Sequence, residues 1–270
     1  MKALLALFSL LVLTSLCLGG EVKPGQIGGG SFGEVYECAF PNTVNLDGEI
    51  DEVAWRFAPW HVVRHNDGPR PSTSDKDSFY EFAAVADKDF LYVAFKVYDD
   101  ALIKGETSGC NVYKDDSVEI YIDAGNEENN TYDANDAQIT IGTENIGGDV
   151  NNPILGGCVG VTQGPQTGTK AAVKKTDYGY AVEAAVPFKN IGWKIEPKDK
   201  LVIGFNTHIN DDDDGGDEDH ILNWSLKDVA DTSWQDPSVF GKLKFVEKSL
   251  SVSTGQVLPI TWGEVKQLCP

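Results

Sequence analysis

Two acidic stretches carry oxygen ligands of the kind that bind hard cations. Asp123, Asp133 and Asp136 stand among asparagines and glutamates in one of them, and the other, at 211–219, reads DDDDGGDED. Carboxylates crowded this closely repel one another, and a bound Ca²⁺ removes that repulsion. The second stretch has a leucine at its twelfth position, where the helix-loop-helix calcium template requires glutamate. We therefore expect structural calcium at Asp123, Asp133 and Asp136, whereas a solvated loop explains the second stretch equally well.

Trp234 is the aromatic residue whose surroundings favour ligand binding. It lies in the polar segment DTSWQDP, where no strand period would bury it, whereas Trp55 and Trp224 lie in apolar or strand-like contexts. An exposed indole can stack on the CH groups of a sugar ring while polar neighbours bind the hydroxyls. A single loop tryptophan is also a common packing anchor, so the residue alone leaves both interpretations open.

No arrangement of residues points to catalysis. With 42 acidic residues, carboxylate pairs of the kind that glycosidases use are unavoidable. No G-x-S-x-G nucleophile motif and no His-Glu-x-x-His zinc motif accompanies the four histidines. Glu119 and Glu183 stand in mid-strand on faces that the alternation directs towards solvent, so we expect them to be solvated.

These candidate residues must be positioned by β-strands, because the dominant hydrophobic period is two. Val118, Ile120 and Ile122, for example, alternate with Glu119 and Tyr121. The predicted strands are 79–86, 90–98, 117–123, 137–142, 170–176, 180–186, 201–209, 221–225 and 240–246. Their turn-rich connectors and the lack of an amphipathic helix predict an all-β fold, an antiparallel β-sandwich of jelly-roll or immunoglobulin-like two-sheet architecture.

Composition and charge exclude several classes of protein. A chain of 270 residues with 41% hydrophobic residues can bury a core, which excludes global disorder. The formal net charge of −20 argues against nucleic acid and anionic membranes, since both require a basic surface. No apolar run after the first 20 residues is long enough to span a membrane. Cations, neutral molecules and other proteins remain as partners.

The two ends of the chain predict export. Residues 1–20 combine Lys2, an apolar stretch and small residues, which is the layout of a secretory signal. We expect a secreted or cell-surface protein with a Gly-rich segment at 21–37, a domain at 38–247 and a tail at 248–270. The TWGEVK in that tail is similar to endings that act as sorting tags on some secreted bacterial proteins.

Removal of the signal leaves Cys38, Cys110, Cys158 and Cys269, an even number that permits three disulfide pairings. Cys110 and Cys158 both lie in Gly- and Asn-rich loops, which favours that pair. Four partly buried free thiols are the alternative.

A set of motifs resembles the family 9 carbohydrate-binding modules. In chain order they are NLDGEIDEVAW at 45–55, DFLYVA at 89–94, YKDDSVEIYID at 113–123, DAQ at 136–138, GYAVEAAV at 179–186, IGFN at 203–206 and SWQDPSVFG at 233–241. The resemblance implies a non-catalytic β-sandwich with bound calcium, commonly attached to xylanases and other glycan-degrading enzymes. Members of that family hold a sugar, often at the reducing end of a chain, between two aromatic rings.

The resemblance also implies a set of binding residues. Trp234 matches one stacking aromatic, Tyr113 takes the place of the other, and Glu119 matches a hydroxyl-binding acid. Thr140 replaces an arginine of the family pattern, His208 a glutamine and Asp231 an asparagine, so the sugar specificity is left open. The expected ligand-binding residues are Trp234, Tyr113, Glu119, His208, Asp231 and Thr140.

The leading hypothesis is a secreted, non-catalytic protein that binds a polysaccharide or oligosaccharide, including chain ends, and associates with glycoside hydrolases. One alternative is a glycan-degrading hydrolase, or its accessory subunit, that uses a carboxylate pair. Another is a surface structural protein in which the sandwich is only a scaffold.

Overall fold

The computed structural model describes residues 29–103 and 109–249. The strands are β1 (Val35–Phe40), β2 (His61–Val63), β3 (Ser78–Ala86), β4 (Phe90–Asp99), β5 (Ser117–Asp123), β6 (Asp136–Gly142), β7 (Leu155–Gly156), β8 (Lys170–Lys175), β9 (Gly179–Pro187), β10 (Val202–Asp211), β11 (His220–Asn223) and β12 (Gly241–Glu247). The helical elements are α1 (Val53–Phe57) and the 3₁₀ turns η1 (Gly109–Lys114), η2 (Thr143–Asn145), η3 (Gly164–Thr167) and η4 (Pro237–Val239). The predicted signal at 1–20 lies outside the described residues. The same is true of the predicted tail, apart from its first two residues, 248 and 249.

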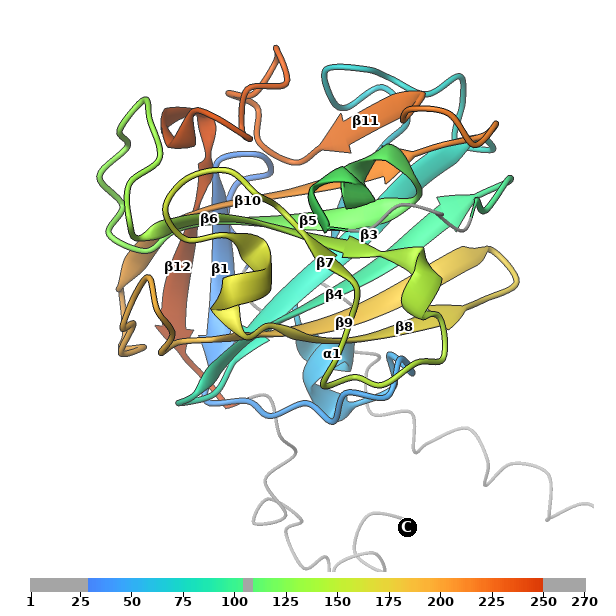
Figure 1. Ribbon diagram of the computed structural model, residues 1–270. Coiled ribbons are helices and arrows are strands. Elements are labelled where there is room, and N and C mark those ends of the chain that lie inside the picture. The colour runs from blue at the N-terminus through green and yellow to red at the C-terminus, as the bar shows by residue number, and fades with distance from the viewer. Residues whose placement is uncertain (1–28, 104–108, 250–270) are drawn as a thin grey trace, which may run out of the picture.

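Two layers of strands pack face to face. The first contains β7, β6, β5, β10 and β12 in that order, and the second contains β3, β4, β9 and β8. Ile120 and Phe205 of the first layer meet Phe82, Phe95 and other residues of the second in one hydrophobic core. The alternation of apolar residues therefore has its physical cause in this interlayer core, and the prediction of a β-sandwich is confirmed (Figure 1).

The strand β1 joins the two layers and departs from the antiparallel pattern. It pairs in parallel with β12 from Val35 to Phe40 and touches β3 at the single pair Ala39 and Val85. The sheet is therefore continuous and mixed, curling from one layer into the other through β1. The predicted domain begins at residue 38, and β1 adds three residues before that boundary.

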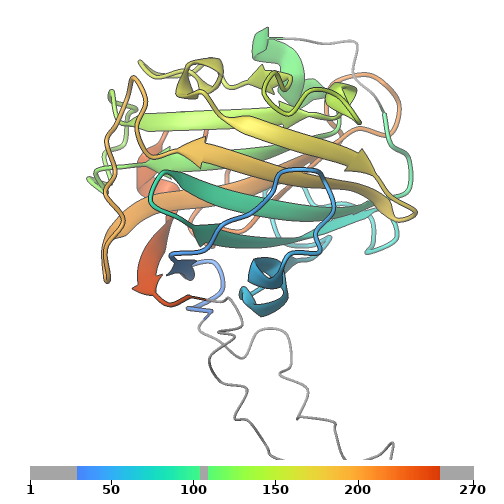
Figure 2. The same cartoon turned by 90° about the horizontal axis from the view of Figure 1, so that it is seen from below.

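The outer face of the second layer is covered by the chain that leads to α1. Trp55 and Ala58 pack there against Val85, Tyr92 and other residues in a second hydrophobic cluster. Figure 2 shows this segment and α1 lying against the strands of that layer. The cover explains why Glu183 of β9, which was expected to be solvated, is fully buried.

Glu183 connects this cover to the sheet. Nε1 of Trp55 donates to its Oε1 at 2.7 Å, and the backbone N–H groups of Asp47 and Gly48 donate to its Oε2 at 3.2 and 2.9 Å. Burial raises the pKa of Glu183 to about 7, although these three donors oppose the shift. A buried carboxylate with three donors holds the segment before α1 in a defined place.

Among the described residues, no helix has the length and apolarity needed to cross a bilayer.

We predict that Glu183→Ala lowers the free energy of unfolding by about 3 kcal/mol, because three buried donors lose their acceptor. Urea denaturation followed by tryptophan fluorescence measures the change. Glu196→Ala is the control, since Glu196 is largely exposed and its loss is expected to cost less than about 0.5 kcal/mol. Equal effects of the two substitutions would contradict the role of Glu183.

Candidate functional site

The outer face of the first layer carries a cavity of about 390 Å³. Side chains of β5, β6 and β10 form its floor, and the segments around 110–113, 157–159, 218–221 and 231–234 form its walls. The lining residues are Cys110, Tyr113, Glu119, Tyr121, Gln138, Thr140, Gly157, Cys158, Val159, Asn210, Glu218, Ile221, Asp231 and Trp234. Five of the six predicted binding residues are therefore brought together, and His208 is the exception.

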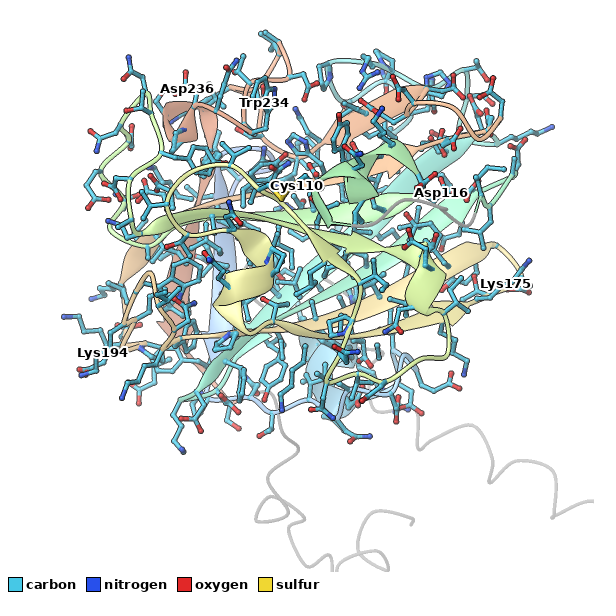
Figure 3. The ribbon with its side chains drawn as sticks, in the orientation of Figure 1. Cys110, Asp116, Lys175, Lys194, Trp234 and Asp236 are labelled. Carbon is cyan, nitrogen blue, oxygen red and sulfur yellow. A yellow bond between two sulfur atoms is a disulfide. The ribbon has the colours of Figure 1, made fainter. Side chains whose placement is uncertain are left out.

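Two aromatic side chains stand partly in solvent at this cavity. Trp234 is 43% exposed and Tyr113 is 37% exposed, although both are large and apolar. Figure 3 shows Trp234 on the loop that precedes β12, above Cys110 in that view. Exposed rings at the mouth of a concave site can stack on an apolar ligand face.

Glu119 is the centre of the cavity floor and is only 2% exposed. Its Oε1 accepts hydrogen bonds from Nε2 of Gln138 at 2.9 Å and from the Thr140 hydroxyl at 2.8 Å. Its Oε2 accepts from the Tyr121 hydroxyl. The expectation that Glu119 is solvated was wrong, because loops cover the outer face of the strand as well. The satisfied carboxylate fixes the three polar side chains around it.

His208 lies behind this floor and does not line the cavity. Its Nδ1 is 3.6 Å from Oε2 of Glu119, and its Nε2 is 3.4 Å from Oδ2 of Asp228. Burial by itself would raise the pKa of Asp228. The contact with His208 and the N–H groups of Ser233 and Thr232 lower this pKa and hold it well below its usual range. His208 therefore stands beside Glu119 and Asp228 and is not among the residues that line the cavity, unlike the other five predicted binding residues.

Acidic groups stand on the walls. Asp231, which adopts a left-handed backbone conformation with φ of 54°, has a raised pKa because burial disfavours its charge and because Glu119 and Asp228 are near. Glu218 accepts from Arg70, both at its carboxylate and at its backbone oxygen. Carboxylates on the walls and amides on the floor offer hydrogen-bond acceptors and donors to a neutral polar ligand.

A disulfide closes one side of the cavity. Cys110 in η1 is bonded to Cys158, which follows β7, with an S–S distance of 2.07 Å. The favoured pairing is thereby confirmed, Cys38 is a buried free thiol, and Cys269 lies outside the described residues. The bond ties the turn that carries Tyr113 to the loop that crosses β6.

Sequence reasoning missed Tyr121 and Gln138, although the strand register could have found them. Glu119 faces Thr140, and Tyr121 faces Gln138, in the pairing of β5 with β6. Residues two apart share a face, so an acid assigned to the binding face also places Tyr121 and its partner there. Glu218 carried no such signal, because a loop brings it to the cavity.

The predicted calcium ligands do not converge. Oδ1 of Asp123 accepts from the N–H of Asn126 at 2.6 Å, Oδ2 accepts from that of Glu128 at 3.2 Å, and Oδ2 of Asp136 accepts from that of Asp133 at 2.7 Å. Within the described part of the chain, these three acids do not gather their oxygens into one cation-sized group. The calcium ligand set stays a prediction, and in this structure Asp123 and Asp136 accept hydrogen bonds from backbone N–H groups of their own loop.

The chain is similar in sequence to part of a xylanase. Over 204 residues the chain is 33% identical to an endo-1,4-beta-xylanase A of Thermotoga maritima, a match that covers 75% of this chain and 17% of the xylanase. The chain thus spans about a sixth of the length of that relative.

Solved structures share the fold. A family 9 carbohydrate-binding module from Caldicellulosiruptor kristjanssonii in complex with cellotriose superposes with a TM-score of 0.63 at 23% identity, covering 84% of this chain and 100% of that one. The glucose complex from the same organism gives 0.62 at 23% identity, covering 82% and 100%. Residues 46–248 match the family model described as "Carbohydrate family 9 binding domain-like", and the chain therefore belongs to this family of carbohydrate-binding domains.

Proposed function

We propose that this carbohydrate-binding domain holds a neutral β-1,4-linked glycan in the cavity over β5, β6 and β10, with the sugar between Trp234 and Tyr113. The observation that carries the proposal is the combination of two exposed aromatic rings with a floor of fixed polar groups. Stacking removes the apolar face of a pyranose from water, and Tyr121, Gln138 and Thr140 offer partners to its edge.

The charge of the walls supports a neutral ligand. Asp231 and Glu218 line the cavity, so a uronic acid would meet carboxylates, whereas sugar hydroxyls can donate to them. The similar modules were solved with cellotriose and with glucose, which makes cellotriose the first ligand to test. Each stacked ring contributes on the order of 1 kcal/mol, so a dissociation constant of roughly micromolar to millimolar is expected.

An accessory role beside glycoside hydrolases, in a secreted or surface-bound setting, is part of the same proposal. The relationship to a xylanase supports the association, and the signal-like sequence at 1–20 supports export. The hydrolase alternative is weaker, because the chain matches a binding module and because the hydrogen bonds from Tyr121, Gln138 and Thr140 engage both carboxylate oxygens of Glu119.

We predict that Trp234→Ala weakens cellotriose binding about tenfold or more, since one of the two stacking surfaces is lost. Isothermal titration calorimetry measures the affinity, and thermal unfolding shows that the variant is folded. Phe32→Ala is the matched control: Phe32 is 36% exposed and stacks on His61, away from the cavity-lining residues. An unchanged affinity in Trp234→Ala would remove the aromatic pair from the account.

A second prediction concerns the disulfide. Replacing Cys110 and Cys158 together by serine opens a loop of 48 residues, and the loss of this cross-link is expected to cost about 4 kcal/mol of unfolding free energy. At a temperature where the variant is still folded, cellotriose should bind severalfold more weakly, because Tyr113 is less firmly held. Cys38→Ala should leave the affinity for cellotriose unchanged. Wild-type affinity in the doubly substituted protein would show that the cross-link does not shape the site.

A further inference from the structure

The lining of the glycan cavity carries negative charge without matching positive charge. The acidic side chains of Glu119, Glu218 and Asp231 line it, and no lysine or arginine is among the lining residues that the structure describes. Glu119 belongs to β5, Glu218 to the turn between β10 and β11, and Asp231 to the loop between β11 and η4. The fold therefore brings three separate carboxylates to the same concave surface as the two exposed aromatic rings.

Two of these acids keep acceptor oxygens without a partner. The side chain of Glu218 is only 10% exposed, and while its Oε1 accepts from Arg70, its buried Oε2 makes no hydrogen bond among the described residues. Within the same part of the chain, the carboxylate of Asp231 accepts no hydrogen bond and forms no ion pair. Buried polar groups in folded proteins are normally satisfied, so the cavity wall offers acceptors that a ligand can use.

The charged groups around Asp231 do not balance its charge. Burial disfavours that charge and the carboxylates of Glu119 and Asp228 repel it, so the pKa of Asp231 is raised although His208 and Arg70 act in the opposite direction. Arg70 is itself paired with another carboxylate, and His208 lies between Glu119 and Asp228. An additional positive charge beside Asp231 is therefore favourable.

We propose that the cavity prefers a β-1,4-linked glucosamine oligomer, in which the amino groups are free, over the neutral glucose oligomer, with sugar ammonium groups bound at Asp231 and Glu218. This inference rests on the proposed function, because the sugar ring lies between Trp234 and Tyr113 in both cases. Glucosamine keeps the ring and linkage of glucose and carries an ammonium in place of one hydroxyl. An ammonium has three N–H donors and a positive charge, whereas the hydroxyl that it replaces is neutral and donates once.

The aromatic rings and the unpartnered oxygens together define the kind of cation. A cation close to the face of Trp234 or Tyr113 is attracted by the ring, which adds to the effect of the carboxylates. A quaternary ammonium shares that attraction but has no N–H, so it would leave Oε2 of Glu218 without a donor. An N-acetylated amine has a donor but no charge. A primary ammonium on a sugar ring meets all of these requirements.

The test compares three trimers by calorimetric titration of the full-length protein: the β-1,4-linked trimer of glucosamine, its N-acetylated form and cellotriose. At about pH 6, where the amines are protonated, the glucosamine trimer should bind at least about fivefold more tightly than cellotriose, and the N-acetylated trimer should not. At about pH 9 this advantage should be lost, because the amines are then neutral. Carboxylates only gain charge over that range, so the loss reports the ammonium. Equal affinities of the glucosamine trimer and cellotriose at the lower pH, or an advantage that persists at the higher pH, would overturn the inference.

Asp231→Asn tests the acidic wall directly. Asparagine tolerates the left-handed backbone at this position, and thermal unfolding verifies that the variant is folded. At about pH 6, its preference for the glucosamine trimer over cellotriose should fall below about twofold. Asp214→Asn is the matched control, because it removes the same charge from an exposed residue outside the cavity lining, and it should keep the preference. A preference that survives in Asp231→Asn, or that is lost equally in Asp214→Asn, contradicts the assignment.

The outcomes separate this inference from the proposed function. If cellotriose binds and the glucosamine trimer binds no more tightly, the proposed function stands and the preference for ammonium fails. If only the glucosamine trimer binds, the neutral ligand of the proposed function is wrong and the ammonium is supported, whereas binding of neither trimer overturns both. Free lysine supplies an ammonium without a sugar ring, so its displacement of bound cellotriose at an equal concentration would assign the wall to amines in general and overturn the amino sugar.

Discussion

The hydrogen-bonding of one buried carboxylate, Glu119, is the constraint on which the cavity depends. A carboxylate removed from water must be satisfied by protein donors, and here Tyr121, Gln138 and Thr140 supply them. The requirement fixes the orientation of three side chains on two paired strands, so the floor is ordered before any ligand arrives. His208 and Asp228 lie close to this network below the floor, behind the groups that line the cavity.

Strands covered on both faces make this arrangement possible. The interlayer core covers one face of β5 and β10, and the walls of the cavity cover the other, so polar residues on the outer faces are buried as well. Glu183 plays the corresponding part on the outer face of the second layer, where it joins the segment before α1 to β9. The formal charge of −20 thus includes buried acids with structural tasks, such as Glu119 and Glu183.

The sequence predicted features that local patterns determine, and it missed features that depend on contacts between distant segments of the chain. The period-two alternation identified β5 and β10, and the motifs around Trp234 and Tyr113 identified the rings that now line one cavity. The strand β1 was not among the predicted strands, and its parallel pairing with β12, about 200 residues further along the chain, is a contact that alternation does not reveal. Alternation also cannot tell that a loop covers an outer face, and so the burial of Glu119 and Glu183 was not foreseen.

The acidic residues illustrate the same limit. Crowding in the sequence suggested Asp123, Asp133 and Asp136 as ligands, yet carboxylates in a tight loop also accept the hydrogen bonds of that loop's own amides. The fold brings oxygens of Asp99, Asp116 and Asp211 within 4.8 Å of one another from three separate places in the chain. Local density of charge found part of this group, since Asp211 begins the acidic stretch 211–219, but could not place Asp99 and Asp116 beside it.

The most direct test of the central claim is an NMR titration of the full-length protein with cellotriose, following the tryptophan indole N–H signals. The indoles of Trp55, Trp60 and Trp224 donate to acceptors inside the protein, so their signals should hardly move. The Trp234 signal should shift progressively with the ligand, together with backbone signals of Tyr113 and Gln138. A titration in which cellotriose binds and Trp234 remains unperturbed would contradict the account.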